Sequence, residues 1–171
     1  TAWLERQRGW TGVCVDPFPR DFTNRTCQVC SYAVSNDGLP REFIRVSIDR
    51  RDGGDVSYFS GFKKYISAHW GLISEFCDYE IIEVPTITID ELYRKYNLPD
   101  YIDFLSVDVE GGEVEIFDSI NLKKYRYGLI VFELNEDQSA RLHIGGLLMG
   151  AGYIHVESLR MDDIYLNQEL S

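Results

Sequence analysis

Positive charge and histidine are both scarce in this sequence. Its 17 lysines and arginines stand against 28 aspartates and glutamates, which gives a formal net charge of −11. Phosphate backbones are bound by basic stripes, so we expect no nucleic-acid partner. The three histidines, His69, His143 and His155, are scattered without metal-ligand spacing. A histidine isolated from other titratable groups is expected to be structural.

Long apolar runs are missing as well. No run approaches the ~20 residues that a membrane helix needs, so we expect no membrane span, and the first residues show no secretory signal. Cys27 and Cys30 have Cys-x-x-Cys spacing, but neither a second pair nor a nearby histidine completes a zinc site. We therefore expect structural thiols in a reducing cytoplasm, with a metal or redox role as the alternative.

Apolar residues, in contrast, are abundant and regularly placed. They make up 44% of the 171 residues, enough for the core of one domain. Strands are predicted at residues 11–15, 27–34, 41–48, 56–59, 79–84, 102–107, 127–134, 153–156 and 163–167, and helices at 3–8, 62–76, 89–98, 114–120 and 138–149. This alternation predicts an α/β fold with a mainly parallel sheet covered on both sides and a C-terminal antiparallel hairpin.

Two helix starts carry recognisable signals. Thr88 is followed three residues later by Glu91, which predicts a capping box. Glu113 and Glu115 stand at the start of the next helix, where acids favour the positive end of the helix dipole. We expect both glutamates to face solvent.

Acidic residues end three of the predicted core strands. Asp16, Asp108 and Glu133 occupy these positions, and Gly111-Gly112 follows the second of them. In open α/β sheets the ligand lies beyond the carboxyl ends of the strands. Acids there can bind ribose hydroxyls, take a proton from a substrate or hold a divalent cation, and paired glycines let the backbone approach a ligand. One such acid is more often a simple cap, but three together favour a ligand site.

Several segments resemble the FkbM family of S-adenosylmethionine-dependent methyltransferases. The specific ones are "VPTITIDEL" at residues 84–92 and "IDFLSVDVEGGE" at residues 102–113, and weaker pieces match in the same order over nearly the whole chain. The resemblance implies a class I methyltransferase fold, a Rossmann-like three-layer sandwich, with S-adenosylmethionine as cofactor. It also implies O-methylation of a hydroxyl on a sugar, polysaccharide or related small molecule.

The resemblance also implies roles for individual residues. It places Asp16 at the cofactor ribose, Ala33 and Ser35 at the adenine, and Asp108 beside the methionine end and the reacting hydroxyl. The implied cofactor-binding residues are Asp16, Pro17, Ala33, Ser35 and Asp108, and the implied catalytic residues are Asp108, Glu110 and Glu133. Asp108 acts either as the base directly or as the holder of a divalent cation, and the identity of any metal stays open.

Family members carry a glycine-rich first strand and loop that this sequence lacks ahead of its first matching segment. We therefore expect a single methyltransferase-like domain over residues 1–171 that is incomplete at its N-terminus, with its first strand missing. We expect these residues alone to bind S-adenosylmethionine weakly or not at all, unless a homodimer closes the sheet. Residues 40–79 are expected to form an inserted ribbon and helix, either a substrate lid or an edge cover, in which Trp70 is a core residue or lines the acceptor pocket.

Three classes of function are consistent with these patterns. The first is an O-methyltransferase, and the second is a non-catalytic binding or scaffold domain derived from one. The third is another nucleotide-dependent enzyme, such as a dehydrogenase, which requires a Gly-x-Gly-x-x-Gly fingerprint. The sequence contains no such fingerprint, so the third class is the weakest.

Overall fold

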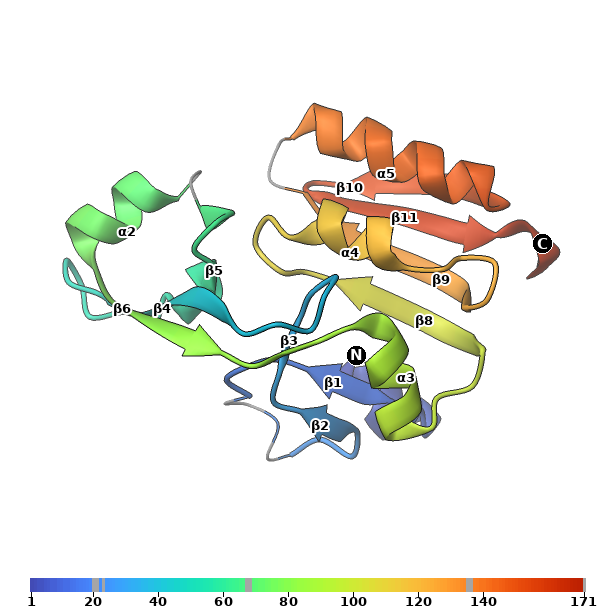
Figure 1. Cartoon of the computed structure of the whole chain (residues 1–171), viewed down its shortest axis with the longest axis horizontal. Coiled ribbons are helices and arrows are strands. Elements are labelled where there is room, and N and C mark those ends of the chain that lie inside the picture. The colour runs from blue at the N-terminus through green and yellow to red at the C-terminus, as the bar shows by residue number, and fades with distance from the viewer. Residues whose placement is uncertain (20–21, 23, 67–68, 135–136, 171) are drawn as a thin grey trace.

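The computed structural model describes residues 1–19, 22, 24–66, 69–134 and 137–170 as an α/β fold (Figure 1). In chain order the elements are α1 (Ala2–Arg8), β1 (Val13–Val15), β2 (Gln28–Cys30), β3 (Ala33–Val34), β4 (Arg41–Asp49), η1 (Ser57–Phe59), β5 (Gly61–Phe62), α2 (Trp70–Phe76), β6 (Cys77–Val84), β7 (Thr86–Ile87), α3 (Ile89–Tyr96), β8 (Tyr101–Val107), α4 (Glu113–Ser119), β9 (Arg126–Glu133), α5 (Gln138–Gly150), β10 (Tyr153–Leu159), β11 (Asp162–Asn167) and η3 (Gln168–Leu170).

The largest sheet has the strand order β10-β11-β9-β8. Strands β8 and β9 are parallel, and β11 runs antiparallel to both β9 and β10. The predicted parallel neighbours and the predicted C-terminal hairpin are therefore confirmed. In the described part of the chain, the edge of β8 opposite β9 pairs with no strand.

Helices α4 and α5 pack together and cover one face of this sheet (Figure 1). Phe117 from α4 and Ile144 and Leu148 from α5 are fully buried against Ile130 and Phe132 of β9. Phe117 meets Phe132 edge-on, with the ring centroids 5.0 Å apart. The apolar stripes that predicted these helices thus form the main core.

Two short parallel pairs, β1-β2 and β3-β7, form small sheets separate from the largest one. The single strand predicted at residues 27–34 is divided, because β2 pairs with β1 whereas β3 pairs with β7. Other strand pairs are antiparallel, so the fold contains both kinds of pairing and the prediction of a mainly parallel sheet is wrong. The ladders of β4 with β5 and β6, and of β11 with its neighbours, are all antiparallel.

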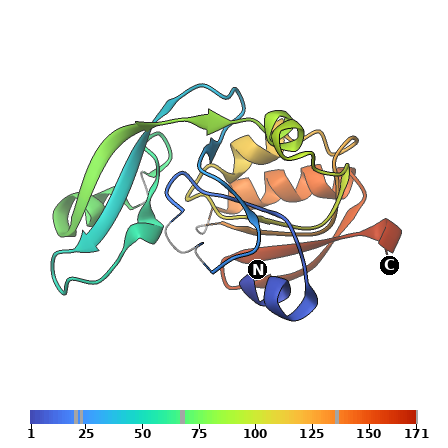
Figure 2. The same cartoon turned by 90° about the horizontal axis from the view of Figure 1, so that it is seen from below.

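Residues 41–84, here called the ribbon, extend away from the main sheet (Figures 1 and 2). Its frame is the antiparallel pairing of β4 with β5 on one side and β6 on the other. The strand predicted at residues 56–59 is wrong, because Asp55 accepts a 2.9 Å hydrogen bond from the Ser57 N–H and starts the turn η1. The helix predicted at residues 62–76 forms only as α2, because Phe62 pairs with Phe43 in the β4–β5 ladder.

The predicted capping box is confirmed at the start of α3. The Glu91 N–H donates to Thr88 Oγ1 at 3.2 Å, and the Thr88 N–H donates to Glu91 Oε2 at 3.0 Å. Among the described helices the longest, α5, has 13 residues, and none combines the length and apolar character that crossing a bilayer requires.

We predict that Thr88→Ala lowers the free energy of unfolding by about 1 kcal/mol, because the first turn of α3 loses the side-chain acceptor of an otherwise unpaired N–H group. Urea denaturation followed by circular dichroism measures this loss. Thr11→Ala, at an exposed position outside the helices, is the matched control and should change the value by less than about 0.5 kcal/mol. An equal effect of the two substitutions would contradict a capping role.

Candidate functional site

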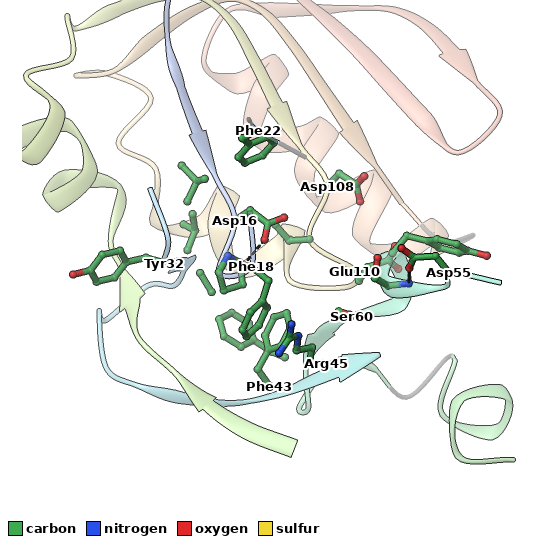
Figure 3. Close-up of a pocket in the computed structure, with 18 residues that line it drawn as sticks. Asp16, Phe18, Phe22, Tyr32, Phe43, Arg45, Asp55, Ser60, Asp108 and Glu110 are labelled. Carbon is green, nitrogen blue, oxygen red and sulfur yellow. Dashed lines mark hydrogen bonds between the residues drawn. The ribbon is translucent and has the colours of Figure 1, made fainter. Parts of the chain in front are cut away.

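A cavity of about 400 Å³ lies between the ends of β1 and β3, the turn after β8 and the inner face of the ribbon (Figure 3). The residues that line it are Val15, Asp16, Pro17, Phe18, Phe22, Tyr32, Ala33, Val34, Phe43, Arg45, Asp55, Ser57, Tyr58, Ser60, Phe62, Asp108, Val109 and Glu110. Five predicted site residues therefore face one space, and two, Ser35 and Glu133, do not line it.

Asp16 is fixed at the end of β1 by its own turn. Its N–H continues the parallel ladder to the Cys30 carbonyl at 3.0 Å. One carboxylate oxygen, Oδ1, accepts a hydrogen bond from the Phe18 N–H at 2.6 Å, and Pro17 between them restricts the backbone. This turn thus orients the carboxylate at the wall of the cavity, as a hydroxyl-binding acid requires.

The two residues predicted to contact adenine have different surroundings. Ala33 lines the cavity, where a small side chain leaves room for a flat ligand. Ser35 is fully buried, lies 2.7 Å from Thr86 Oγ1 and accepts a hydrogen bond from the Gly38 N–H. Its hydroxyl holds the turn after β3, and its role in cofactor binding stays a prediction without support from this geometry.

The turn after β8 is shaped by a buried carboxylate. Glu113, only 4% exposed, accepts hydrogen bonds of 3.2 Å from the N–H groups of Val109 and Gly111. The prediction that Glu113 faces solvent is wrong, because these bonds offset part of the cost of burial. Burial nevertheless raises the pKa of this carboxyl, and nearby Asp108 adds to the shift.

Glycines in this turn accommodate the ribbon. Gly111 has φ 106°, and a Cβ there would lie 3.1 Å from the Cβ and 3.2 Å from the carbonyl oxygen of Tyr65. A Cβ on Gly61 would lie 3.2 Å from the Cβ of Glu110, which itself has φ 55°. The hypothesis that Gly111-Gly112 leaves space for a ligand is therefore wrong, since Tyr65 occupies that space.

Three acids form a row across the sheet at this edge. Glu133 on β9 is directly paired with Asp162 on β11, and Asp108 follows the Val107–Phe132 pair of β8 and β9. Cross-strand neighbours share a face of the sheet, so the carboxylates are placed to repel one another. Although Asp108 keeps exposed surface at the cavity, the surrounding protein and then Asp162 raise its pKa.

Glu133 experiences the same repulsion. Burial is the main cause that raises its pKa, followed by Asp108, Asp162 and Glu113. Asp162 does not line the cavity, but it acts on both Asp108 and Glu133, and sequence reasoning missed this influence. The neighbours of Asp162 depend on how β11 pairs with β9, which no local pattern reveals.

The ribbon supplies an aromatic wall. Phe43 packs against Phe62 at 5.9 Å and against Phe18 at 5.6 Å between ring centroids. The Arg45 guanidinium lies 4.6 Å from the Phe18 ring centroid and pairs with Glu80 at 3.0 Å. Trp70, the alternative residue for an acceptor pocket, packs instead against Tyr79 and does not line the cavity.

Glu115 attaches the ribbon to α4. Its Oε1 accepts a 2.6 Å hydrogen bond from Arg41 Nη1 and a 3.1 Å bond from the Asn36 N–H, and its Oε2 accepts one from the Tyr65 hydroxyl. Burial acts to raise the pKa of Glu115, but these hydrogen bonds together outweigh burial and lower the pKa. The prediction that Glu115 faces solvent is wrong, because the ribbon covers it.

Among the described residues, one group of three has ligand atoms close enough to hold a metal ion. It consists of Glu5, Cys14 and Cys27, whose ligand atoms lie within 4.8 Å of one another. None of them lines the cavity. A divalent cation at Asp108 therefore stays an alternative without a preformed ligand set in the described residues.

These features define a class of protein: an α/β fold whose ligand cavity opens at the carboxyl ends of strands and is lined by an acid from each of two strand ends. A family model described as the methyltransferase FkbM domain matches residues 1–154. The chain belongs to this family, which confirms the resemblance and indicates a methyltransferase. No curated protein and no solved structure gives a significant match.

We predict that Gly111→Ala destabilises the protein by about 2 kcal/mol or more, because the residue has positive φ and its new Cβ meets Tyr65. Chemical denaturation measures the change. Gly146→Ala is the matched control: Gly146 lies within α5 and a Cβ there meets nothing within 4 Å, so a gain of up to about 1 kcal/mol is expected. A loss below about 0.5 kcal/mol for Gly111→Ala would contradict the close packing.

We also predict that Glu133→Gln stabilises the protein at neutral pH. Because the folded state raises the pKa of Glu133, it binds more protons than the unfolded state between the ordinary and the raised pKa, and stability falls as pH rises through that window. The gain of the variant should therefore shrink as pH is lowered from about 7 to about 3.5. Thermal denaturation over this range tests it, with exposed Glu75→Gln as control. A gain that grows on acidification would contradict the prediction.

Proposed function

We propose that the protein is an S-adenosylmethionine-dependent O-methyltransferase that acts on a hydroxyl of a sugar, polysaccharide or related small molecule. The observation that carries this proposal is that Asp16 and Asp108, from two different strand ends, open onto one cavity in a member of a methyltransferase family. In the proposed arrangement the fold is the class I, Rossmann-like three-layer type.

The residues around the cavity fit the cofactor at its nucleoside end. Asp16 presents a carboxylate to the ribose hydroxyls, while Tyr32 and Ala33 supply the flat and apolar surroundings that an adenine ring requires. The fit is weaker at the methionine end, because none of the described lining residues is a glycine. Backbone contacts to that end would come from the turn that carries Val109 and Glu110.

The chemistry of the step depends on position and on one proton. When bound, S-adenosylmethionine supplies an electrophilic methyl group in line with the acceptor oxygen. Holding the reactants in that line can contribute on the order of 7–11 kcal/mol. Asp108, which lines the cavity, is proposed to accept the proton of the acceptor hydroxyl, and its raised pKa would make it a better base than an ordinary aspartate. Glu110 and Glu133 are proposed to support this acid from the same turn and the neighbouring strand.

The ribbon is proposed to hold the acceptor. Tyr58 is 61% exposed yet lines the cavity, and an exposed aromatic face suits a sugar ring. Ser57 and Ser60 beside it offer hydroxyl groups that can exchange hydrogen bonds with ring hydroxyls. In this proposal the ribbon is an acceptor wall or lid, and the particular sugar is left open.

A second candidate is a non-catalytic binding domain with the same cavity. The absence of glycine from the described cavity lining favours it, since a loop that wraps the methionine end normally supplies backbone N–H groups. The two candidates differ in turnover, not in fold. Methyl transfer from labelled cofactor to a panel of sugars, measured with the intact protein, separates them.

In that assay we predict that Asp108→Asn lowers kcat by roughly 10²-fold or more with the fold retained, as is usual for an acid–base residue. Asp16→Ala should instead raise the KM for the cofactor with a smaller effect on kcat, because it removes binding rather than chemistry. Asp103→Asn, at an exposed position on β8, is the control. Near-normal kcat for Asp108→Asn at saturating cofactor would remove Asp108 from the mechanism, and loss of activity on chelation would favour the cation alternative.

A further inference from the structure

Outside the cavity, two thiols meet where β1 lies beside the start of β2. Cys14 lies in the middle of β1, and Cys27 immediately precedes β2. Their Sγ atoms are 2.8 Å apart, closer than two sulfur atoms that merely touch. Both residues are partly buried and both are free thiols. Their side chains therefore already point at each other across the β1–β2 pair.

Cys27 does not meet Cys30, although the two residues have Cys-x-x-Cys spacing. Cys30 is fully buried in a separate apolar cluster with Ile87 and Leu92. Positions three apart in an extended chain point to opposite faces, so Cys27 is directed away from Cys30. The residue that Cys27 meets is Cys14, thirteen positions earlier in the chain.

A charged network holds this pair in place. Arg25 Nη2 lies 3.2 Å from Cys14 Sγ, and Arg25 Nε donates a 2.7 Å hydrogen bond to Glu5 Oε1. Glu5 Oε2 in turn accepts hydrogen bonds from the N–H groups of Thr26 at 2.8 Å and Cys27 at 3.3 Å. The carboxylate of α1 thus fixes the backbone that carries Cys27, and the guanidinium lies against the sulfur of Cys14.

This network argues against a metal ion at Glu5, Cys14 and Cys27. The guanidinium of Arg25 contacts both Glu5 and Cys14, so a cation would have to displace a positive group that is already paired. A cation site needs neighbours that leave the ligand atoms free. A covalent bond between the two sulfur atoms needs only a small approach and no displacement.

We propose that Cys14 and Cys27 form an intramolecular disulfide when the protein meets a disulfide oxidant such as oxidised glutathione. In the first step one thiolate attacks the oxidant, forms a mixed disulfide and releases one reduced glutathione. In the second step the other cysteine attacks the protein sulfur of that mixed disulfide, which forms the Cys14–Cys27 bond and releases the second glutathione. Two thiol protons and two electrons leave the protein, and one oxidant molecule is reduced to two thiols.

The cross-link would close the chain segment that forms one wall of the cavity. This segment carries Asp16, Pro17 and Phe18, so the bond would reduce the freedom of the residues that face the ligand. Its effect on cofactor affinity rests on the proposed function, whereas formation of the bond does not. Pre-organising a binding wall improves affinity because less freedom is lost on binding.

Peptide mapping of the intact protein tests the bond itself. The protein is incubated with excess oxidised glutathione, free thiols are alkylated at low pH, and the digest is analysed by mass spectrometry. We expect a peptide pair linked through Cys14 and Cys27, with Cys30 and Cys77 alkylated. Recovery of alkylated Cys14 and Cys27, stable glutathione adducts on them, or a Cys27–Cys30 link would overturn the proposal.

Matched variants test the consequence for stability. Closing a loop of this length should raise the Tm of the oxidised wild type by roughly 5–10 °C. Cys27→Ser and Cys14→Ser should show no such shift, while Cys77→Ala, in the ribbon, should retain it. A shift that persists in Cys27→Ser would contradict the proposed link, and the mapping on wild type decides the matter if a variant fails to fold.

Calorimetry with S-adenosylmethionine separates this inference from the proposed function. We expect the oxidised protein to bind about threefold more tightly than the reduced protein. Equal affinity in a protein shown to be cross-linked would overturn the coupling between the bond and the cavity. Absence of binding in both states of the intact protein would overturn the proposed function, while the linked peptide would still establish the disulfide.

Discussion

The turn from Asp108 to Gly112 is the constraint on which the site depends. Its backbone passes through two positive-φ residues in succession, Glu110 and Gly111, and such a path persists only where the surroundings enforce it. The enforcing group is the carboxylate of Glu113, which binds two N–H groups of the turn from inside the protein. The same turn presents Asp108 to the cavity on one side and receives Tyr65 on the other.

The position of the ribbon follows from this turn. Gly61 and Tyr65 pack against it without space for an added methyl group, and Glu115 in the first turn of α4 binds Arg41 at the base of β4. The ribbon is therefore attached at its base through both packing and charge. The inner face of the ribbon forms one wall of the cavity, and the strand ends form the opposite wall. Both walls therefore depend on the turn from Asp108 to Gly112.

Local signals in the sequence predicted the elements whose stability is local. The capping box at Thr88 and Glu91 depends on four consecutive residues, and β8 and β9 coincide with apolar runs of strand length. The acids at the strand ends were found for the same reason, because a strand end is visible in sequence. Contacts between distant segments were not predictable in this way. The burial of Glu113, the pairing of Glu133 with Asp162 and the division of the 27–34 strand all depend on tertiary partners.

The row of carboxylates at the sheet edge also bears on how a finished reaction would end. A sulfonium donor carries a positive charge that disappears when its methyl group leaves. Opposite charges about 4 Å apart attract by about 1 kcal/mol in water and by several times that near a protein surface. Under the proposed function, Asp108 at the cavity wall, with Glu133 and Asp162 beside it on the sheet, would therefore hold the charged donor more firmly than the neutral thioether that remains. An edge that is costly for the fold, because its acids repel one another, would thus help the spent cofactor to leave and a fresh one to replace it.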